Sequence, residues 1–257
     1  MTAALVLAGT RPGGDPFARE LGLPHKALIA IEGETLLARV VGALKGAGMA
    51  RVLVSCEEGP VADLARELGA EVIAPRSGPS GSVAAAFELV GAPLVVTTSD
   101  HALLKARWVR EIIERTPRTA DLSVMLAERG VVEKALPNSR RTYLRFADGH
   151  WSGCNLFYLQ GAKARRAIDT WAMVEADRKR PWRIAARLGP GTLLSMLLGR
   201  LTMSEGLARL GNRIRVEAAL VPASDGLAAV DVDKAADLEA VRALIALRQE
   251  KASSAED

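Results

Sequence analysis

Short, wholly apolar runs alternate with amphipathic stretches along the first half of the chain. ALVLA at 4–8 is typical of a strand buried on both faces, and TLLARVVGALKGAG at 35–48 has helical spacing and ends in glycine. The same succession predicts strands at 51–56, 71–75 and 93–100 and helices at 61–69, 82–91 and 104–116. Strands and helices that alternate in this way predict an α/β fold with a parallel sheet and helices on both faces.

The second half of the chain departs from this regular alternation. ADLSVMLAE at 120–128 predicts a strand, and TYLRFADGHWSGCNLFYLQ at 142–160 predicts strands around a DG turn. A helical region then fills 162–210, followed by a late strand at 213–222 and a terminal helix at 235–250. We therefore expect a three-layer αβα sandwich with a mostly parallel sheet and a helical elaboration at about 162–210.

Length and composition favour one large domain. The chain has 257 residues, of which 49% are hydrophobic, enough to bury a sizeable core. We expect a single domain over 1–250 and a disordered tail at 251–257. The formal charge of +4 is spread along the sequence, with one dense cluster, RKRPWR at 178–183. This distribution favours an anionic small molecule over a nucleic acid, although both remain open.

Cysteine usage and hydropathy indicate a reduced, cytoplasmic protein. Cys56 and Cys154 lie far apart, and no Cys/His spacing typical of a structural zinc site occurs. No apolar run reaches the roughly 18 residues that span a bilayer, and the N-terminal run is too short for a signal peptide. The apolar stretch GTLLSMLLGRL at 191–201 predicts a core helix, with contact to a membrane surface or a lipid-like substrate as the alternative.

The glycine-rich loop after the first strand is the first candidate for chemistry. In open parallel sheets, ligands bind beyond the carboxyl ends of the strands, and LVLAGTRPGG at 5–14 lies there. Glycines let backbone amides approach an anion, and Arg11 and Lys26 can neutralise it. The loop fits neither GxGxxG nor GxxxxGK[ST], which makes a dehydrogenase or a P-loop NTPase improbable. The alternative is that both cations are merely solvated.

Three segments in order resemble the MobA-like NTP transferases: LAGTR at 7–11, PHK at 24–26 and GETLLARVVGAL at 33–44. The loop here is longer than usual, one alanine replaces a common pair, and His25 occupies the usual proline position. The resemblance implies a Rossmann-like fold of the nucleotide-diphospho-sugar transferase type. It also implies a nucleotide-binding loop at Leu7, Ala8 and Gly9, with Arg11 and Lys26 as catalytic residues that stabilise the triphosphate.

Two aspartates are candidates for a magnesium site. Asp100 ends the strand VVTTSD, which places its carboxylate at the edge of the sheet where phosphates are expected. Mg²⁺ takes oxygen ligands and typically one or two carboxylates with substrate phosphates and water. AVDVDKAADLEAV at 229–241 is similar to the family's V-D-T-P-E-D-L segment, which implies Asp233 as the second ligand. Asp231 is the other candidate, and Asp233 as a helix N-cap is the structural alternative.

The nucleobase and the acceptor have weaker candidates. The family's Gly/Ser segment beside the base matches SGPSGSVAAAF at 77–87, so the resemblance implies Ser80, Gly81 and Ser82, with an ordinary N-cap at Ser82 as the alternative. Its G-x-N segment implies acceptor or sugar contacts by Asn155 and, less directly, Gly153. In RKRPWR, Lys179 and Arg180 can hold an acceptor phosphate, although a solvated basic face is an equal alternative. We expect neither Cys154 as a nucleophile nor a role for His101.

The combined expectation is a Mg²⁺-dependent nucleotidyltransferase. It would transfer a nucleoside monophosphate from an NTP, CTP or GTP, to a phosphorylated small molecule and release pyrophosphate. A protein that binds a nucleotide or nucleotide-sugar without turnover is the alternative. Nucleic-acid binding through 178–183 is the least favoured of the three, because the cluster is short and few aromatic residues interrupt it.

Overall fold

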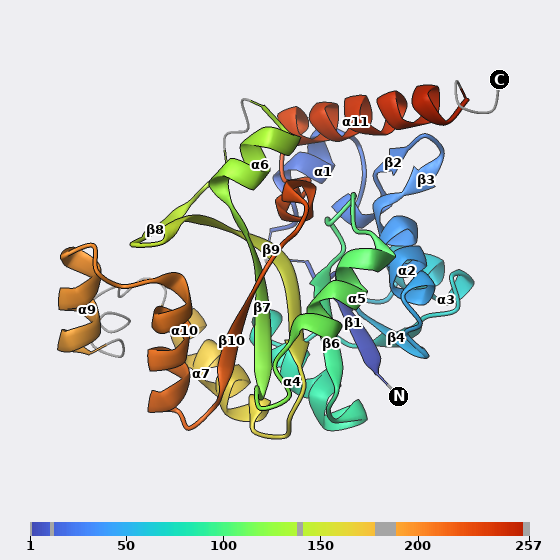
Figure 1. Ribbon diagram of the computed structural model, residues 1–257. Coiled ribbons are helices and arrows are strands. Elements are labelled where there is room, and N and C mark those ends of the chain that lie inside the picture. The colour runs from blue at the N-terminus through green and yellow to red at the C-terminus, as the bar shows by residue number, and fades with distance from the viewer. Residues whose placement is uncertain (1, 11–12, 138–140, 178–188, 254–257) are drawn as a thin grey trace.

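A large sheet forms the centre of the protein, with helices on both sides of it, in the computed structural model (Figure 1). The structure describes residues 2–10, 13–137, 141–177 and 189–253. The sheet has eight strands in the order β10-β7-β9-β6-β1-β4-β5, with β8 paired to β9. β9 runs antiparallel to its neighbours, and the other pairs along this order are parallel. The strand bounds are β1 Ala3–Leu7, β4 Arg51–Ser55, β5 Glu71–Ile73, β6 Leu94–Thr98, β7 Leu122–Glu128, β8 Leu144–Phe146, β9 Gly149–Leu159 and β10 Ala218–Pro222, with a separate hairpin of β2 Ala30–Ile31 and β3 Glu34–Thr35.

Helices cover both faces of the sheet, so the expected αβα layering is confirmed. The helices packed into the core of one face are α2 Leu36–Gly46, α3 Pro60–Glu67, α5 Ala106–Arg115, α6 Arg129–Ala135 and α11 Ala235–Ser253. The other face is covered by α4 Gly78–Val90, α7 Ala164–Ala176 and α10 Met203–Arg213. The short α1 Pro16–Glu20 and α9 Pro190–Leu197 complete the described helices, and α9 lies at the periphery beside α10 (Figure 1).

The first strand explains why the apolar runs are continuous rather than alternating. Ala4 and Val6 of β1 belong to the core under α2 and α5, whereas Ala3 and Leu5 belong to the core under α4 and α7. Both faces of β1 are buried, so each of these positions has to be apolar. Because β1 pairs in parallel with β4 and β6, the carboxyl ends of these three strands meet at one edge of the sheet, and the loops that follow them lie close together.

The structure moves several predicted boundaries. α4 begins at Gly78 rather than 82, because Pro79 is compatible with the first turn of a helix and Ser77 takes the N-cap position. β10 begins at Ala218, five residues later than expected. α11 continues to Ser253, three residues into the segment expected to be a disordered tail.

The prediction of a core helix at 191–201 is wrong for most of that stretch. Leu194, Met196, Leu197 and Leu198 are exposed, and Leu197 is 84% exposed. Among the residues of this stretch whose burial the structure describes, Leu201, past the end of α9, is the buried one. These side chains are exposed because α9 lies on the outer side of α10, away from the sheet (Figure 1). A hydrogen bond of 3.0 Å from Arg209 Nη1 to Ser195 Oγ links the two helices. Among the described residues, no helix is both long and apolar enough to cross a membrane.

Candidate active site

Lys26, Asp100 and Asp233 meet at the carboxyl edge of the sheet. The Lys26 ammonium forms an ion pair with Asp100 Oδ2 and a second one, 2.8 Å long, with Asp233 Oδ1. The Asp100 and Lys26 side chains are 11% and 19% exposed, whereas that of Asp233 is 62% exposed. Residues that lie 207 positions apart in sequence thus form one charged cluster that opens to solvent on the side of Asp233.

Backbone hydrogen bonds fix the two aspartates beside each other. Asp100 follows β6, and the amide of the preceding Ser99 donates to the Leu7 carbonyl at 3.0 Å, which ties this turn to β1. The Val232 amide donates to the Asp100 carbonyl, also at 3.0 Å, and so holds the 231–233 segment against it. The hydroxyl of Thr98 donates to Asp100 Oδ1. The sheet therefore sets the position of Asp100, and the Val232 amide brings the segment that carries Asp233 beside it.

The electrostatics of this cluster favour a charged lysine. Burial by itself lowers the pKa of Lys26, but the carboxylates of Asp100 and then Asp233 outweigh it and raise that pKa above its ordinary value. Lys26 begins a short 3₁₀ helix, Lys26–Leu28, whose first amides are organised by His25. The cation is thus permanent at neutral pH and held by a fixed backbone.

Asp231, the alternative candidate for the metal, belongs to a neighbouring polar network. Its Oδ1 accepts from Arg141 Nη2 at 2.7 Å, and its Oδ2 accepts from Asn155 Nδ2 at 2.8 Å. Burial raises the pKa of Asp231, and although Arg141 opposes this shift, the negative charges of Asp233 and Asp100 add to it. With both its oxygens hydrogen-bonded, Asp231 anchors the 231–233 segment, and Asp233 is the residue that shares the Lys26 ammonium with Asp100.

A β-bulge aims Asn155 into this network. In the β7–β9 pair, Val124 lies opposite Phe157 and Leu126 lies opposite Gly153, so three residues of β9 face Met125 alone. Asn155 is the middle one and has φ +48°, a left-handed conformation that asparagine tolerates better than most residues. The bulge explains why an asparagine can stand in the middle of this strand and point into the polar network.

The glycine-rich loop already holds an anionic group in this structure. The Thr10 amide donates to both carboxylate oxygens of Glu57 at 3.2 Å, and the Ala8 amide donates to the Ser55 carbonyl at 2.9 Å. Leu7 ends β1, Ala8 is buried and Gly9 is exposed. Arg11 lies outside the described residues. The loop can therefore present a backbone amide to an anion, as the sequence predicts, and its arginine stays a prediction.

His25, at the family's usual proline position, connects this loop to Lys26. Its Nδ1 accepts from the Ala27 amide at 2.9 Å, and the ring also hydrogen-bonds the backbone of Gly9. Burial and then the charge of Lys26 lower the pKa of His25, so the ring stays neutral and keeps its acceptor nitrogen. Sequence reasoning assigned no function to this substitution, and the His-Lys pair was the only signal for it.

The segment predicted to read the nucleobase lies in the first turns of α4. Ser80 is buried, and both its amide and its hydroxyl donate to Glu175 Oε2 of α7, at 3.3 and 2.5 Å. Ser82 is not the N-cap; its Oγ accepts from the Arg76 amide at 3.0 Å. An ideal Cβ on Gly81 would lie 3.0 Å from Arg76 Cβ, so the helix start packs closely there. Glu175 was missed because nothing marks it within the helical pattern of α7.

The remaining candidates separate into two groups. Lys179 and Arg180, the predicted acceptor contacts, lie outside the described residues. Cys154 and His101 are both buried: burial raises the pKa of the Cys154 thiol and lowers the pKa of His101 to about 4. The thiol and the imidazole are therefore both neutral at neutral pH, and the expectation that neither takes part in the chemistry stays a prediction.

The charged cluster has the donor chemistry that a hard divalent cation needs. Asp100 and Asp233 both approach the Lys26 ammonium, so their carboxylates lie within reach of one cation. No group of three or more acidic, histidine or cysteine side chains that could hold a metal occurs among the described residues. A pair of carboxylates completed by phosphate oxygens and water is the arrangement typical of Mg²⁺ in nucleotide sites. The residues therefore fit a metal that binds together with its nucleotide.

Comparison with known proteins decides between the possible uses of such a site. The sequence profile of the MobA-like NTP transferase domain matches residues 4–189, most of the chain. The chain belongs to this family. A hypothetical transferase from Thermus thermophilus is 30% identical to this NTP transferase over 93% of the chain and 100% of its own length, with a TM-score of 0.80. The comparison with curated proteins gave no match.

More distant solved structures share the fold. A CMP:2-keto-3-deoxy-manno-octonic acid synthetase complexed with CTP has a TM-score of 0.61 at 17% identity, covering 96% of this chain and 99% of its own. A 2-C-methyl-D-erythritol 4-phosphate cytidylyltransferase, also from Thermus thermophilus, has a TM-score of 0.51 at 16% identity, covering 95% and 99%. These likenesses confirm the nucleotide-diphospho-sugar transferase fold. Together with the family match, they make this NTP transferase a nucleotidyltransferase, as the resemblance implied.

Proposed function

We propose that this nucleotidyltransferase transfers a nucleoside monophosphate from CTP or GTP to a phosphorylated small molecule, with Mg²⁺, and releases pyrophosphate. The observation that carries the proposal is the convergence of Lys26, Asp100 and Asp233 at the carboxyl edge of the sheet, next to a loop that offers a backbone amide to an anion. Membership in the NTP transferase family supplies the reaction class. One of the fold neighbours is a synthetase complexed with CTP and another is named a cytidylyltransferase, which makes CTP the first nucleotide to test.

The reaction needs little covalent work from the protein. An oxygen of the acceptor phosphate attacks the α-phosphorus, the bond from that phosphorus to the α,β-bridging oxygen breaks, and pyrophosphate leaves with the electron pair. A phosphate acceptor is already ionised at neutral pH, so no general base is required. Positioning and stabilisation of the developing negative charge supply the rate. In this proposal the permanent cation of Lys26, the loop amides and the guanidinium of Arg11 provide that stabilisation.

Asp100 and Asp233 are the residues that would hold Mg²⁺. When bound, the metal supplies charge neutralisation on the phosphate oxygens. The protein's own contribution is to hold the two carboxylates side by side through the Val232 amide and the Thr98 hydroxyl. The exposed position of Asp233 leaves the solvent side of the cluster accessible to a nucleotide.

Substrate contacts are assigned to three further groups. Ser80, Gly81 and Ser82 bind the nucleobase side of the nucleotide, where Glu175 now accepts from Ser80 and would have to share or release those donors. Asn155 lies in the network beside the metal candidates and contacts the sugar or the acceptor. Lys179 and Arg180 bind the acceptor phosphate.

The test is a matrix of pyrophosphate release, with each of the four NTPs set against pools of phosphorylated sugars, polyols and cofactor precursors in the presence of Mg²⁺. The proposal expects release only where CTP or GTP meets one acceptor pool, and loss of release when EDTA is added. Release independent of any acceptor would point to hydrolysis instead. No pyrophosphate release with any combination of NTP and acceptor pool, together with thermal stabilisation by a nucleotide, would favour the non-catalytic binding protein.

A further inference from the structure

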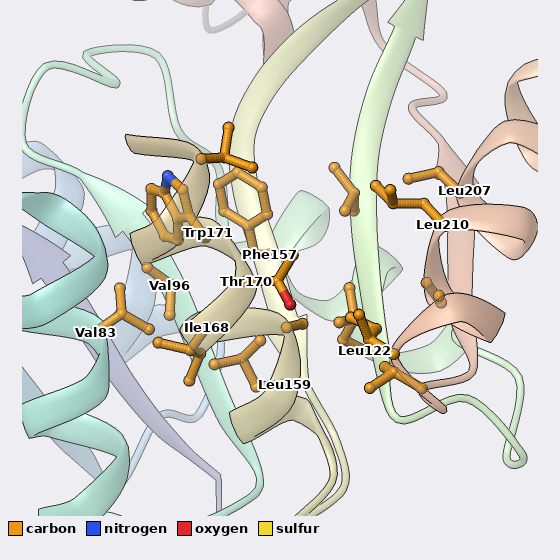
Figure 2. Close-up of a pocket in the computed structure, with 17 residues that line it drawn as sticks. Val83, Val96, Leu122, Phe157, Leu159, Ile168, Thr170, Trp171, Leu207 and Leu210 are labelled. Atoms are coloured by element: carbon orange, nitrogen blue, oxygen red, sulfur yellow. The ribbon is translucent and has the colours of Figure 1, made fainter. Parts of the chain in front are cut away.

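A large apolar cavity lies on the face of the sheet covered by α4, α7 and α10, and the function proposed above makes no use of it. Its volume is about 300 Å³, and Figure 2 shows its side chains on two sides of a gap. Trp171 and Phe157 stack on one side with ring centroids 6.2 Å apart, and Leu207 and Leu210 of α10 lie on the other. Apart from Thr170, the residues that line it are hydrophobic or glycine.

The cavity is separate from the charged cluster. Leu122 and Ala218 are the first residues of the parallel strands β7 and β10, and Leu159 is the last residue of the antiparallel β9; all three line the cavity. The cavity thus lies toward the amino ends of the parallel strands, whereas Lys26, Asp100 and Asp233 lie beyond the carboxyl ends of β1 and β6. A molecule bound in the cavity therefore does not lie where the phosphate groups react.

The lining selects hydrocarbon and rejects polar ligands. The one hydroxyl, that of Thr170, donates to the Arg166 carbonyl at 2.8 Å and is already satisfied. An apolar cavity of about 150 Å³ holds one benzene ring, so about twice that volume suits a chain of ten to twelve carbons. Leu210 is 37% exposed and so marks the point where the cavity meets solvent.

The charge beside that opening identifies the other end of the ligand. From Met203 to Arg215, α10 and the turn after it carry three arginines, Arg209, Arg213 and Arg215, against one acid, Glu205. All three arginines are exposed. Beyond α10, α9 and the residue that follows it expose four further apolar side chains. We propose that the cavity between α7 and α10 binds the hydrocarbon chain of an anionic amphiphile, a site distinct from the nucleotidyl-transfer centre.

Isothermal titration of the full-length protein with octanoate, decanoate, dodecanoate and hexadecanoate, each below its micelle concentration, tests the site. Burial of each added methylene is expected to tighten binding about three- to fourfold up to roughly twelve carbons, after which the gain should stop because the cavity is full. Affinity that does not depend on chain length, or the lack of any saturable binding, overturns the proposal without reference to a variant.

Two matched substitutions assign the binding to the cavity. Leu210→Glu places a charge in the lining at a position that already meets solvent, and it should weaken dodecanoate at least tenfold. Leu197→Glu makes the same change on α9, outside the cavity, and should change the affinity less than twofold. Equal effects of the two variants would show non-specific adsorption and would contradict the assignment of binding to the cavity.

Two further arms close the test. Val174→Trp fills the lining from the α7 side and should block the chain even if Leu210→Glu fails to fold. Vesicles of phosphatidylglycerol, tested beside free dodecanoate, distinguish the source of the chain. Binding to free carboxylate alone assigns a soluble amphiphile, and binding to both with the same loss in Leu210→Glu assigns a membrane lipid. Binding to vesicles that Leu210→Glu leaves intact contradicts the cavity as the site.

Discussion

The two ends of the sheet are built on opposite principles. At the carboxyl ends, charged groups are held by backbone hydrogen bonds, so that the half-buried Lys26 pairs with the buried Asp100 and with Asp233. On the α7–α10 side toward the amino ends, about 300 Å³ is lined by side chains that have almost no polar atoms. β9 joins the two regions, because its bulge carries Asn155 into the polar network while Phe157 and Leu159 line the cavity. One strand thus serves two environments because a bulge separates them.

The largest expected effect is on turnover, from a substitution in the charged cluster that leaves binding at the cavity unchanged. Asp100→Asn removes the most buried charge of the cluster and is expected to lower the turnover number about 10³-fold, since preorganised electrostatic groups carry most of the rate. Dodecanoate binding at the cavity should stay close to wild type. Pyrophosphate release and titration measure the two properties in the same preparation.

The control for this substitution is Asp63→Asn, which alters an exposed aspartate of α3 paired with Arg66. It should leave turnover unchanged. If Asp100→Asn kept wild-type turnover, or lost dodecanoate binding along with it, the separation of the two regions would be wrong.

The bulge in β9 gives the second prediction. Asn155→Ala removes the hydrogen bond to Asp231 and places alanine at φ +48°, and it should lower the free energy of unfolding by about 2 kcal/mol. Asn155→Gly loses the same hydrogen bond but accepts the backbone conformation, so it should cost less. Urea unfolding of both variants distinguishes backbone strain from the lost bond. Identical losses would mean that the positive φ contributes nothing.

The third prediction concerns the cation between the two carboxylates. Lys26→Met removes the ammonium that neutralises Asp100 and Asp233, leaving two acids that favour another cation. Without nucleotide, the variant should bind Mn²⁺, used as a probe for Mg²⁺, about tenfold more tightly than wild type, which corresponds to about 1.4 kcal/mol. Titration followed by electron paramagnetic resonance measures it. Adding Asp233→Asn to the variant should cancel the gain, and a gain that survived it would place the metal elsewhere.

The smallest effect is a pH dependence at the loop. The pKa of His25 is lowered in the folded protein, so in acid the unfolded chain binds more protons than the folded one. Stability from the neutral ring is complete above the unfolded value of about 6.5 and is lost as the pH falls below it. Unfolding free energies measured from pH 8 to pH 5 should fall in wild type. His25→Asn, which can accept from the Ala27 amide without titrating, should reduce the slope, and an unchanged slope would assign it to other groups.

Apolar runs and the turn residues between them allowed the fold to be predicted from the sequence. The runs that became β1, β4 and β6 are buried on both faces and could not be mistaken for surface elements, and the Asp148-Gly149 turn marked the β8–β9 hairpin. The start of α4 was missed because glycine, proline and serine suggest a loop, although proline also suits the first turn of a helix. The leucines of α9 were assigned to the core because composition cannot tell a buried apolar helix from an exposed one.

The site residues that a motif or a strand end marks could be predicted from the sequence. Lys26 begins a 3₁₀ helix and Asp233 precedes α11, and resemblance to the family's motifs marked both. The position of Asp100, just after β6, follows from topology. The contacts of Arg141 and Glu175 do not, because each reaches across the fold, to Asp231 and to Ser80, from a segment without a motif. Long-range pairs of this kind depend on packing that no single stretch of sequence records.

The most direct test of the central claim is to follow the label from CTP or GTP carrying ³²P at either the α or the γ position, with Mg²⁺ and the acceptor pool that supports pyrophosphate release. The account predicts that α-label appears in the acceptor product and that γ-label leaves entirely as pyrophosphate. γ-Label in the acceptor would make the protein a kinase, and γ-label released as inorganic phosphate would make it a hydrolase. Either result would contradict the proposed function of Lys26, Asp100 and Asp233.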